Sequence, residues 1–183
     1  SPFINTSDPK NVFTGNPDLK PEIGNRYELT YNHDLGQSGS FMVTLFYREN
    51  KDDIQPFIVY YPIIKVGDTV YTNVAVATRE NIGIEKNIGT NIFCDLHLNS
   101  KLNVRGNLFF FYRHTINQVD KGYNSNSTNY RFNMNASYQF NSDLTAEVFG
   151  NFNSVRHEAQ GTYPSFTSYS MAMRKQLWNK KAS

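Results

Sequence analysis

The chain is 183 residues long, carries a formal net charge of +2 and contains one cysteine, Cys94. Positive and negative residues are interspersed, so the sequence offers no basic surface for nucleic acid, and a single cysteine excludes an internal disulfide framework. A membrane-spanning helix is also excluded, because no apolar run approaches the roughly 20 residues that such a helix needs. Aromatic residues make up 15% of the chain, with 14 Phe and 12 Tyr, and this composition favours an all-β fold.

Residues 1–49 are expected to lead into and form a β-hairpin. Asn16-Pro17 and Lys20-Pro21 are stiff, non-helical dipeptides, so residues 1–24 are expected to be an extended segment before the first strand. Alternating apolar and polar residues then predict a hairpin over residues 25–49. A long connection is expected to follow over residues 50–78.

Alternation is strongest over residues 79–116, which are expected to form a long hairpin. The even-numbered positions between Glu80 and Asn99 are mostly apolar, and the odd-numbered ones are mostly polar. Asn99-Ser100-Lys101 is a short turn sequence, after which the alternation resumes.

The remaining residues repeat this pattern. A connection is expected over residues 117–129, a hairpin over 130–155, a connection over 156–164, and a last strand with its following turn over 165–183. Together these segments predict an antiparallel up-and-down meander of about seven long strands.

The predicted connections alternate in length. Short turns at one end of a sheet and long loops at the other are typical of a bacterial outer-membrane β-barrel, whose long loops are extracellular and whose short turns are periplasmic. We therefore interpret the chain as part of a transmembrane barrel. The segments expected on the extracellular side are residues 1–24, 50–78, 117–129 and 156–164.

In such a barrel, alternation assigns side chains to lipid or to the water-filled lumen. Trp178, next to Asn179-Lys180-Lys181, is expected to anchor the periplasmic interface. The residues expected to face lipid are Ile84, Ile92, Leu96, Val104, Leu108, Phe132 and Phe152. The residues expected to face the lumen are Asn91, Arg105, Arg131 and Glu147.

A soluble extracellular β-sandwich that binds glycans through surface aromatic residues is the alternative, because its strands would also alternate. The length of the strands, the Asn- and Arg-rich polar face and the aromatic residues near strand ends favour the barrel. The position of Trp178 agrees, because a core tryptophan of a sandwich would lie in the middle of a strand.

Residues 15–22 read GNPDLKPE, and a predicted strand follows them. This resembles the GNPxLKPE element that precedes a barrel strand in TonB-dependent receptors, particularly those of the Bacteroidetes type. Further similarities follow in order along the chain. They are FYRENKDDI at residues 46–54, YTN and ENIGIE within residues 71–85, and GTYPSFTSYSMAMRKQLWNKKAS at residues 161–183.

The resemblance implies active uptake of a scarce nutrient, such as a siderophore, cofactor, glycan or peptide, across the outer membrane. The barrel of such a receptor has roughly 22 strands and works with a plug domain, the TonB energy-coupling complex and outer-membrane lipid. The chain is then expected to be a truncated part of that barrel. Residues 1–183 alone are expected to self-associate, because an open sheet leaves two strand edges and an apolar face uncovered.

No residue pattern indicates catalysis or a cofactor. GxSxG and HExxH motifs are absent from the sequence, and the chain is not expected to be an enzyme. Asp95 and His97, which have the same parity as Glu85, suggest a cation site, but two ligands on one strand do not specify a metal. A hydrogen-bond network in the lumen is the favoured interpretation, so no metal site is assigned.

The aromatic residues of the long connections are the candidates for contact with the transported molecule. Tyrosine stacks on flat ligands and also offers a hydroxyl group. The alternative is that residues 50–78 form a hairpin of their own, in which Ile58, Tyr60, Ile63 and Val70 pack together. The candidate contact residues are Phe57, Tyr60, Tyr61, Tyr71 and Tyr123.

Overall fold

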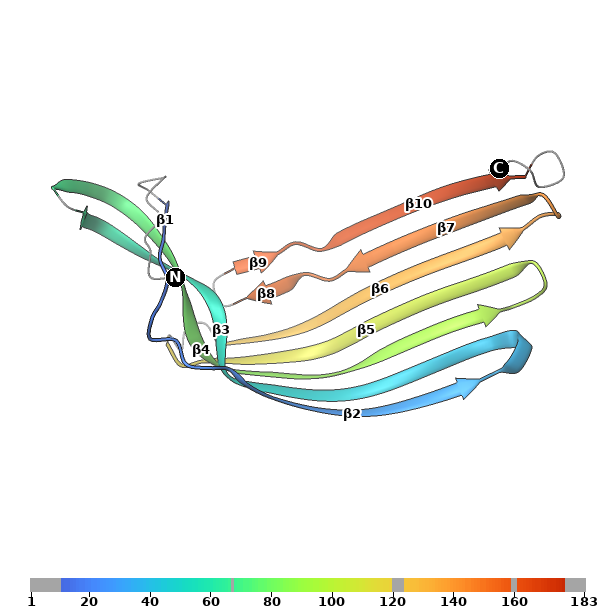
Figure 1. Cartoon of the computed structure of the whole chain (residues 1–183), viewed down its shortest axis with the longest axis horizontal. Helices are drawn as coiled ribbons and strands as arrows, with labels where there is room; N and C mark the ends of the chain where they lie inside the picture. Colours follow the sequence, from blue (N-terminus) through green and yellow to red (C-terminus); the bar gives the residue numbers. More distant parts are fainter. Residues whose placement is uncertain (1–10, 67, 120–123, 159–160, 177–183) are drawn as a thin grey trace.

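The computed structural model describes residues 11–66, 68–119, 124–158 and 161–176. Seven of its strands form one antiparallel meander in the order β2-β3-β4-β5-β6-β7-β10, as the sequence predicts (Figure 1). A short strand, β1 (Asn11–Phe13), pairs in parallel with β4. The meander strands are β2 (Ile23–Asp34), β3 (Gly39–Val66), β4 (Thr69–His97), β5 (Leu102–Asn117), β6 (Ser125–Gln139), β7 (Leu144–Asn153) and β10 (Phe166–Lys175).

Side-chain acceptors close the short turns. Oδ1 of Asn99 accepts hydrogen bonds from the backbone N–H groups of Lys101 and Leu102, at 2.8 and 2.9 Å. Asn141 does the same between β6 and β7, where its Oδ1 accepts from Asp143 and Leu144. A short 3-10 turn, η1 (Gly36–Ser38), joins β2 to β3. The asparagines thus reverse the chain at the predicted places, because their side chains replace a backbone acceptor.

Residues 50–78 differ from the sequence prediction, since they are not a loop. β3 and β4 continue into this region as a hairpin, with register from Ile54 opposite Asn81 to Val66 opposite Thr69. We call residues 54–66 and 69–81 the arm. β-branched and aromatic residues fill it and favour strand structure. The hairpin alternative is therefore correct for these residues. Its packed cluster does not form, because Ile58, Tyr60, Ile63 and Val70 are exposed.

The other long connections are also shorter than predicted. β5 and β6 extend to Asn117 and from Ser125, well into residues 117–129. The connection over residues 156–164 contains a small ribbon of β8 (Arg156–Glu158) and β9 (Gly161–Tyr163). In these segments the backbone N–H and C=O groups keep hydrogen-bond partners on the neighbouring strand, so the strands extend beyond their expected ends.

The register divides the sheet into a polar face and an apolar face. One row across neighbouring strands joins Asn91, Phe109, Arg131 and Asn153, and the adjacent row joins Ile92, Leu108, Phe132 and Phe152. By this register, all residues expected to face the lumen lie on the polar face, and all residues expected to face lipid lie on the apolar face. Their contact with lumen water and with lipid stays a prediction.

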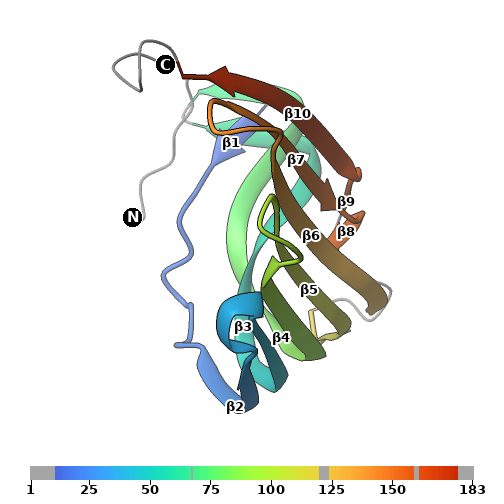
Figure 2. The same cartoon turned by 90° about the vertical axis from the view of Figure 1, so that its right-hand side faces the viewer.

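The sheet is curved (Figure 2), and the burial of its polar side chains indicates that the polar face is the concave one. Polar side chains such as Asn50, Glu85 and Asn129 are buried on this face by their neighbours. On the apolar face, Leu29 is 70% exposed and Met171 is 79% exposed. A curved sheet crowds the side chains on its concave face and spreads those on its convex face. The polar face is therefore concave and the apolar face convex.

A β-sandwich is not found. That fold needs two sheets packed face to face over an apolar core. The described part of the chain forms one curved layer and the β8–β9 ribbon, and its buried hydrophobic side chains are Val12, Val74 and Ile82, at the arm and its base. The alternative interpretation is therefore wrong. No helix in the described ranges is long and apolar enough to cross a membrane.

Cysteines introduced on the two faces of the full-length protein, in a Cys94→Ser background, should differ in labelling by a water-soluble maleimide. Cysteine at Asn91, Arg105 or Arg131 should react, because the polar face is expected to be in contact with lumen water. Cysteine at Ile92, Leu108 or Phe132 should be protected by lipid and become reactive only after denaturation. Equal labelling of both sets in the membrane would contradict this assignment.

Candidate functional site

Three phenylalanines interrupt the polar face near the middle of β3 and β5. The rings of Phe46 and Phe109 are stacked, with centroids 5.2 Å apart and planes 7° apart, and Phe111 lies 5.2 Å from Phe109. Gly89 is opposite both Phe46 and Phe111 in the register. A Cβ at Gly89 would lie 2.5 Å from Cβ of Phe111, so glycine makes room for this cluster.

A charged group adjoins the three rings. Nε of Arg113 lies 3.4 Å from Oε2 of Glu85 and donates a hydrogen bond to Oδ1 of Asn87 at 3.3 Å. Asn87 in turn donates to Oε1 of Glu85 at 2.7 Å. The guanidinium carbon of Arg113 is 5.5 Å from the ring centroid of Phe111, within cation–π distance. The side chains of Arg113 and Glu85 are 18% and 10% exposed, so this pair is largely withdrawn from water.

Two hollows of the concave face share this cluster. One, of about 170 Å³, is lined by Phe46, Arg48 and Glu85 together with Phe109, Phe111 and Arg113. The second, of about 360 Å³, lies toward β6 and the β8–β9 ribbon and includes Arg131 and Arg156. We call the residues around both hollows the concave site. Its rings and guanidinium groups can contact a ligand that combines a flat apolar surface with negative charge.

The predicted contact residues on the arm do not converge. Alternation and register put Tyr60 and Tyr71 on one face of the arm, and Phe57 and Tyr61 on the other. Tyr60 is 76% exposed. Tyr123 and Trp178 lie outside the described residues. The structure therefore does not gather the predicted residues at one place, and their contact with a ligand stays a prediction.

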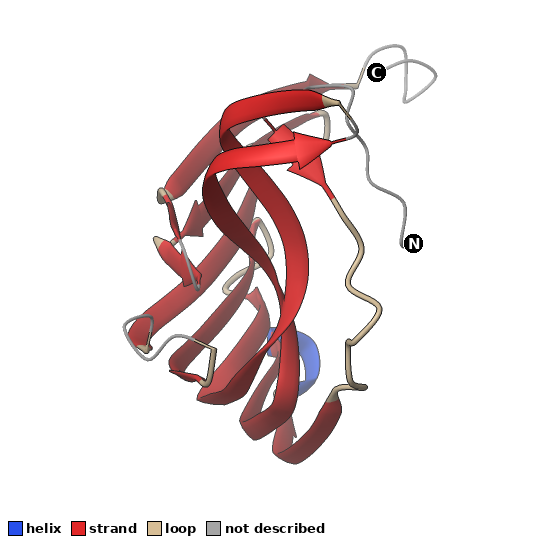
Figure 3. Cartoon of the chain, turned by 90° about the vertical axis from the view of Figure 1, so that its left-hand side faces the viewer, coloured by secondary structure: helices blue, strands red, loops and turns tan. Residues whose placement is uncertain are grey.

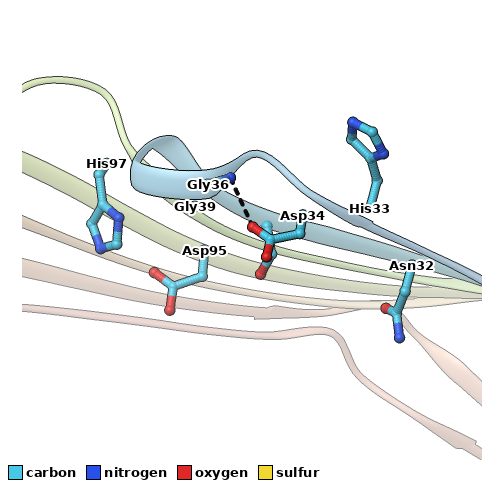
Figure 4. A pocket seen from close by; sticks show the side chains of 8 residues that line it. Asn32, His33, Asp34, Gly36, Gly39, Asp95 and His97 are labelled. Atoms are coloured by element: carbon cyan, nitrogen blue, oxygen red, sulfur yellow. Dashed lines mark hydrogen bonds between the residues drawn. The ribbon is translucent and has the colours of Figure 1, made fainter.

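Asp95 and His97 lie at the opposite end of the sheet, beside the short turns. With Asp34 and its neighbours they line a hollow of about 490 Å³ (Figure 4). Asp95 is bound by Arg105, with Nη2 2.6 Å from Oδ2, and Asp34 accepts a hydrogen bond from the backbone of Gly36 at 2.7 Å. Glu85 belongs to the concave site instead. Within the described residues, no group of three or more potential metal ligands is found.

Sequence reasoning missed the three phenylalanines as site residues. Phe109-Phe110-Phe111 is a continuous aromatic run, so it places rings on both faces of β5. The usable signal was the break in alternation: Phe109 and Phe111 occupy positions whose parity is otherwise polar. An apolar residue on a wet face indicates something that covers it or binds it.

One curved meander with a polar concave face and an apolar convex face defines the wall of an outer-membrane β-barrel. The chain matches the outer membrane protein beta-barrel family over residues 1–183 and belongs to that family. It is therefore an outer-membrane protein. No curated protein matches the chain.

Solved structures with a similar fold include siderophore receptors. A mutant ferric enterobactin receptor, PfeA, from Pseudomonas aeruginosa in complex with enterobactin has a TM-score of 0.57 and 17% identity, over 92% of this chain and 26% of that one. The siderophore receptor PirA from Acinetobacter baumannii has a TM-score of 0.55 and 16% identity, over 92% and 27%. The chain thus spans about a quarter of the length of these receptors.

Replacing Arg113 should destabilise the protein more than replacing Arg105. Arg113→Ala leaves the carboxylate of Glu85 buried without its cation, which costs on the order of 3 kcal/mol. Arg105→Ala removes a more exposed pair with Asp95 and should cost less than about 1 kcal/mol. Urea unfolding of the full-length protein in detergent measures both. Adding Glu85→Gln to Arg113→Ala should restore part of the loss, and equal effects of the two single variants would contradict the burial argument.

Proposed function

We propose that the chain is part of the barrel wall of a TonB-dependent outer-membrane receptor that takes up a scarce nutrient. The observation that carries this proposal is the sidedness of the sheet. The seven meander strands present a mainly polar face to the inside of a curve and exposed apolar residues to its outside. A lumen of water and a surround of lipid satisfy both faces at once.

The partners follow from this role. Outer-membrane lipid covers the apolar face, the receptor's own plug fills the lumen, and the TonB complex supplies energy through the plug. The chain contributes wall, extracellular segments and lumen lining. Its residues bind and enclose the nutrient, and no catalytic step is assigned to them.

A siderophore is the first candidate among the nutrient classes, ahead of a cofactor, glycan or peptide. The guanidinium groups of Arg48 and Arg131 favour negative charge on the ligand, and the stacked rings of Phe46 and Phe109 favour a flat apolar part. Similarity to a ferric enterobactin receptor and to PirA also favours a siderophore over the other nutrient classes.

Uptake by cells that carry or lack the parent gene tests the proposal. Radiolabelled ferric siderophores, cobalamin, oligosaccharides and peptides should be compared in the wild type, a deletion strain and a strain without the TonB complex. One class should lose energy-dependent uptake in both mutant strains. Unchanged uptake of every class would contradict the receptor role.

Single variants connect the concave site to that uptake. Phe109→Ala and Arg131→Ala should each weaken binding of the identified nutrient by about tenfold, because each loses roughly 1.4 kcal/mol of contact. Met171→Ala is the matched control, since Met171 lies on the apolar face. Binding to whole cells should be unchanged in the control.

A further inference from the structure

The segment before β2 is bound along the arm. β1 pairs in parallel with Ala75 to Ala77 of β4, and Val12 is buried there. Farther along, Nδ2 of Asn16 donates to the backbone oxygen of Arg79 and to Oε2 of Glu80, each at 3.0 Å. Its Oδ1 accepts from the backbone of Asp18 at 2.9 Å. One asparagine therefore fixes its own turn and attaches that turn to the arm.

Asn81 makes the reciprocal contacts from the arm. Its Oδ1 accepts from the backbone N–H of Lys20 at 2.8 Å. Its Nδ2 donates to the backbone oxygen of Lys20 at 2.9 Å and to that of Asp52 at 2.7 Å. Oε1 of Glu22 accepts from the backbone N–H of Ile54 at 2.8 Å. These bonds join the leading segment to both strands of the arm.

The hydrogen bonds between the leading segment and the arm lie where the arm leaves the sheet. The register of β3 against β4 shifts on both sides of Asp53, and Asp52 has a positive φ of 54°. Gly83, opposite Asp53, has a φ of 142°, and a Cβ there would lie 2.3 Å from the backbone oxygen of Ile116. A bulge of this kind bends a hairpin. Bonds across it therefore fix the direction that the arm takes.

The direction matters because the arm extends over the concave side. Figures 1 and 2 show it leaving the sheet at the end with the long connections and passing across that end toward the level of β10. In Figure 3 the leading segment runs from β1, beside the arm, to the start of β2. A rotation at the bend would carry the arm away from the end of the concave face.

We propose that Asn16, Asn81 and Glu22 are positioning residues that clamp the arm across the extracellular end of the concave face. The GNPDLKPE element at residues 15–22 supplies two of the three, so its role in this chain is to hold the arm rather than to contact a ligand. The extracellular location, and any benefit of the clamp to nutrient binding, rest on the proposed function. The fixed direction of the arm does not depend on the proposed function.

Distance measurement by double electron–electron resonance tests the clamp in the full-length protein in membrane vesicles. Nitroxide labels at Lys65, on the arm, and Ser142, in a short turn, report the direction of the arm in a Cys94→Ser background. The unmodified clamp should give one narrow distance distribution. Asn81→Ala and Asn16→Ala should each broaden it roughly twofold, because the bend loses its cross-links.

Asn81→Asp should give an intermediate width, because aspartate still accepts from Lys20 but donates to neither backbone oxygen. Asn32→Ala, which changes an exposed asparagine of β2 outside the clamp, is the control and should leave the distribution unchanged. Heat-modifiable gel mobility establishes that each variant is folded. If Asn81→Ala does not fold, Asn16→Ala and Glu22→Ala decide the question.

A distribution as narrow in the folded Asn16→Ala and Glu22→Ala variants as in the unmodified protein would overturn the proposal. The measurement needs no ligand. It therefore gives its answer whether or not the uptake experiment identifies a nutrient, and failure of the clamp can be told apart from failure of the receptor role.

Discussion

An antiparallel hydrogen-bond ladder joins the seven meander strands in the order β2-β3-β4-β5-β6-β7-β10, and this ladder fixes the face on which each of their side chains lies. Because side chains alternate with a period of two, a slip of one residue would exchange the polar and apolar faces of a strand. Away from the bulge at Asp53 the register avoids this, from Thr30 opposite Thr44 to Glu147 opposite Ala172. Both the environment of the sheet and the composition of the concave site depend on it.

The concave site is a local product of that register. Phe46, Gly89 and Phe111 occupy one row, and Arg48, Asn87 and Arg113 occupy the next row on the same face. Curvature brings these rows together, so that the ion pair of Arg113 is mostly buried although the sheet is a single layer. On the other side, large residues such as Tyr169 remain exposed, and no protein layer in the described ranges covers them. Lipid is the environment that removes such a surface from water.

Alternation predicted the strands and faces correctly because the period of two is a direct consequence of strand geometry. The arm was predicted only as the alternative to a loop over residues 50–78, and Pro56 and Pro62 by themselves indicate a loop. They are tolerated because β2 ends its pairing opposite Lys51, so β3 is an edge strand beyond that point and needs no further N–H donors on that side. The concave site was only partly predictable. Arg131 was assigned to its face, but the stacking of Phe46 on Phe109 depends on a register that one strand's sequence does not contain.

We propose that this sheet is a section of a closed outer-membrane barrel, in which further strands pair with β2 and β10. Hydrogen–deuterium exchange of the full-length protein in outer-membrane vesicles tests it most directly, because an amide in a ladder exchanges slowly and an amide at an open edge exchanges fast. In a closed barrel, amides of β2 and β10 that point away from β3 and β7 should be protected as strongly as those in the middle of β5. Exchange at these positions as fast as at the tip of the arm, near Ile63 and Ile64, would contradict it.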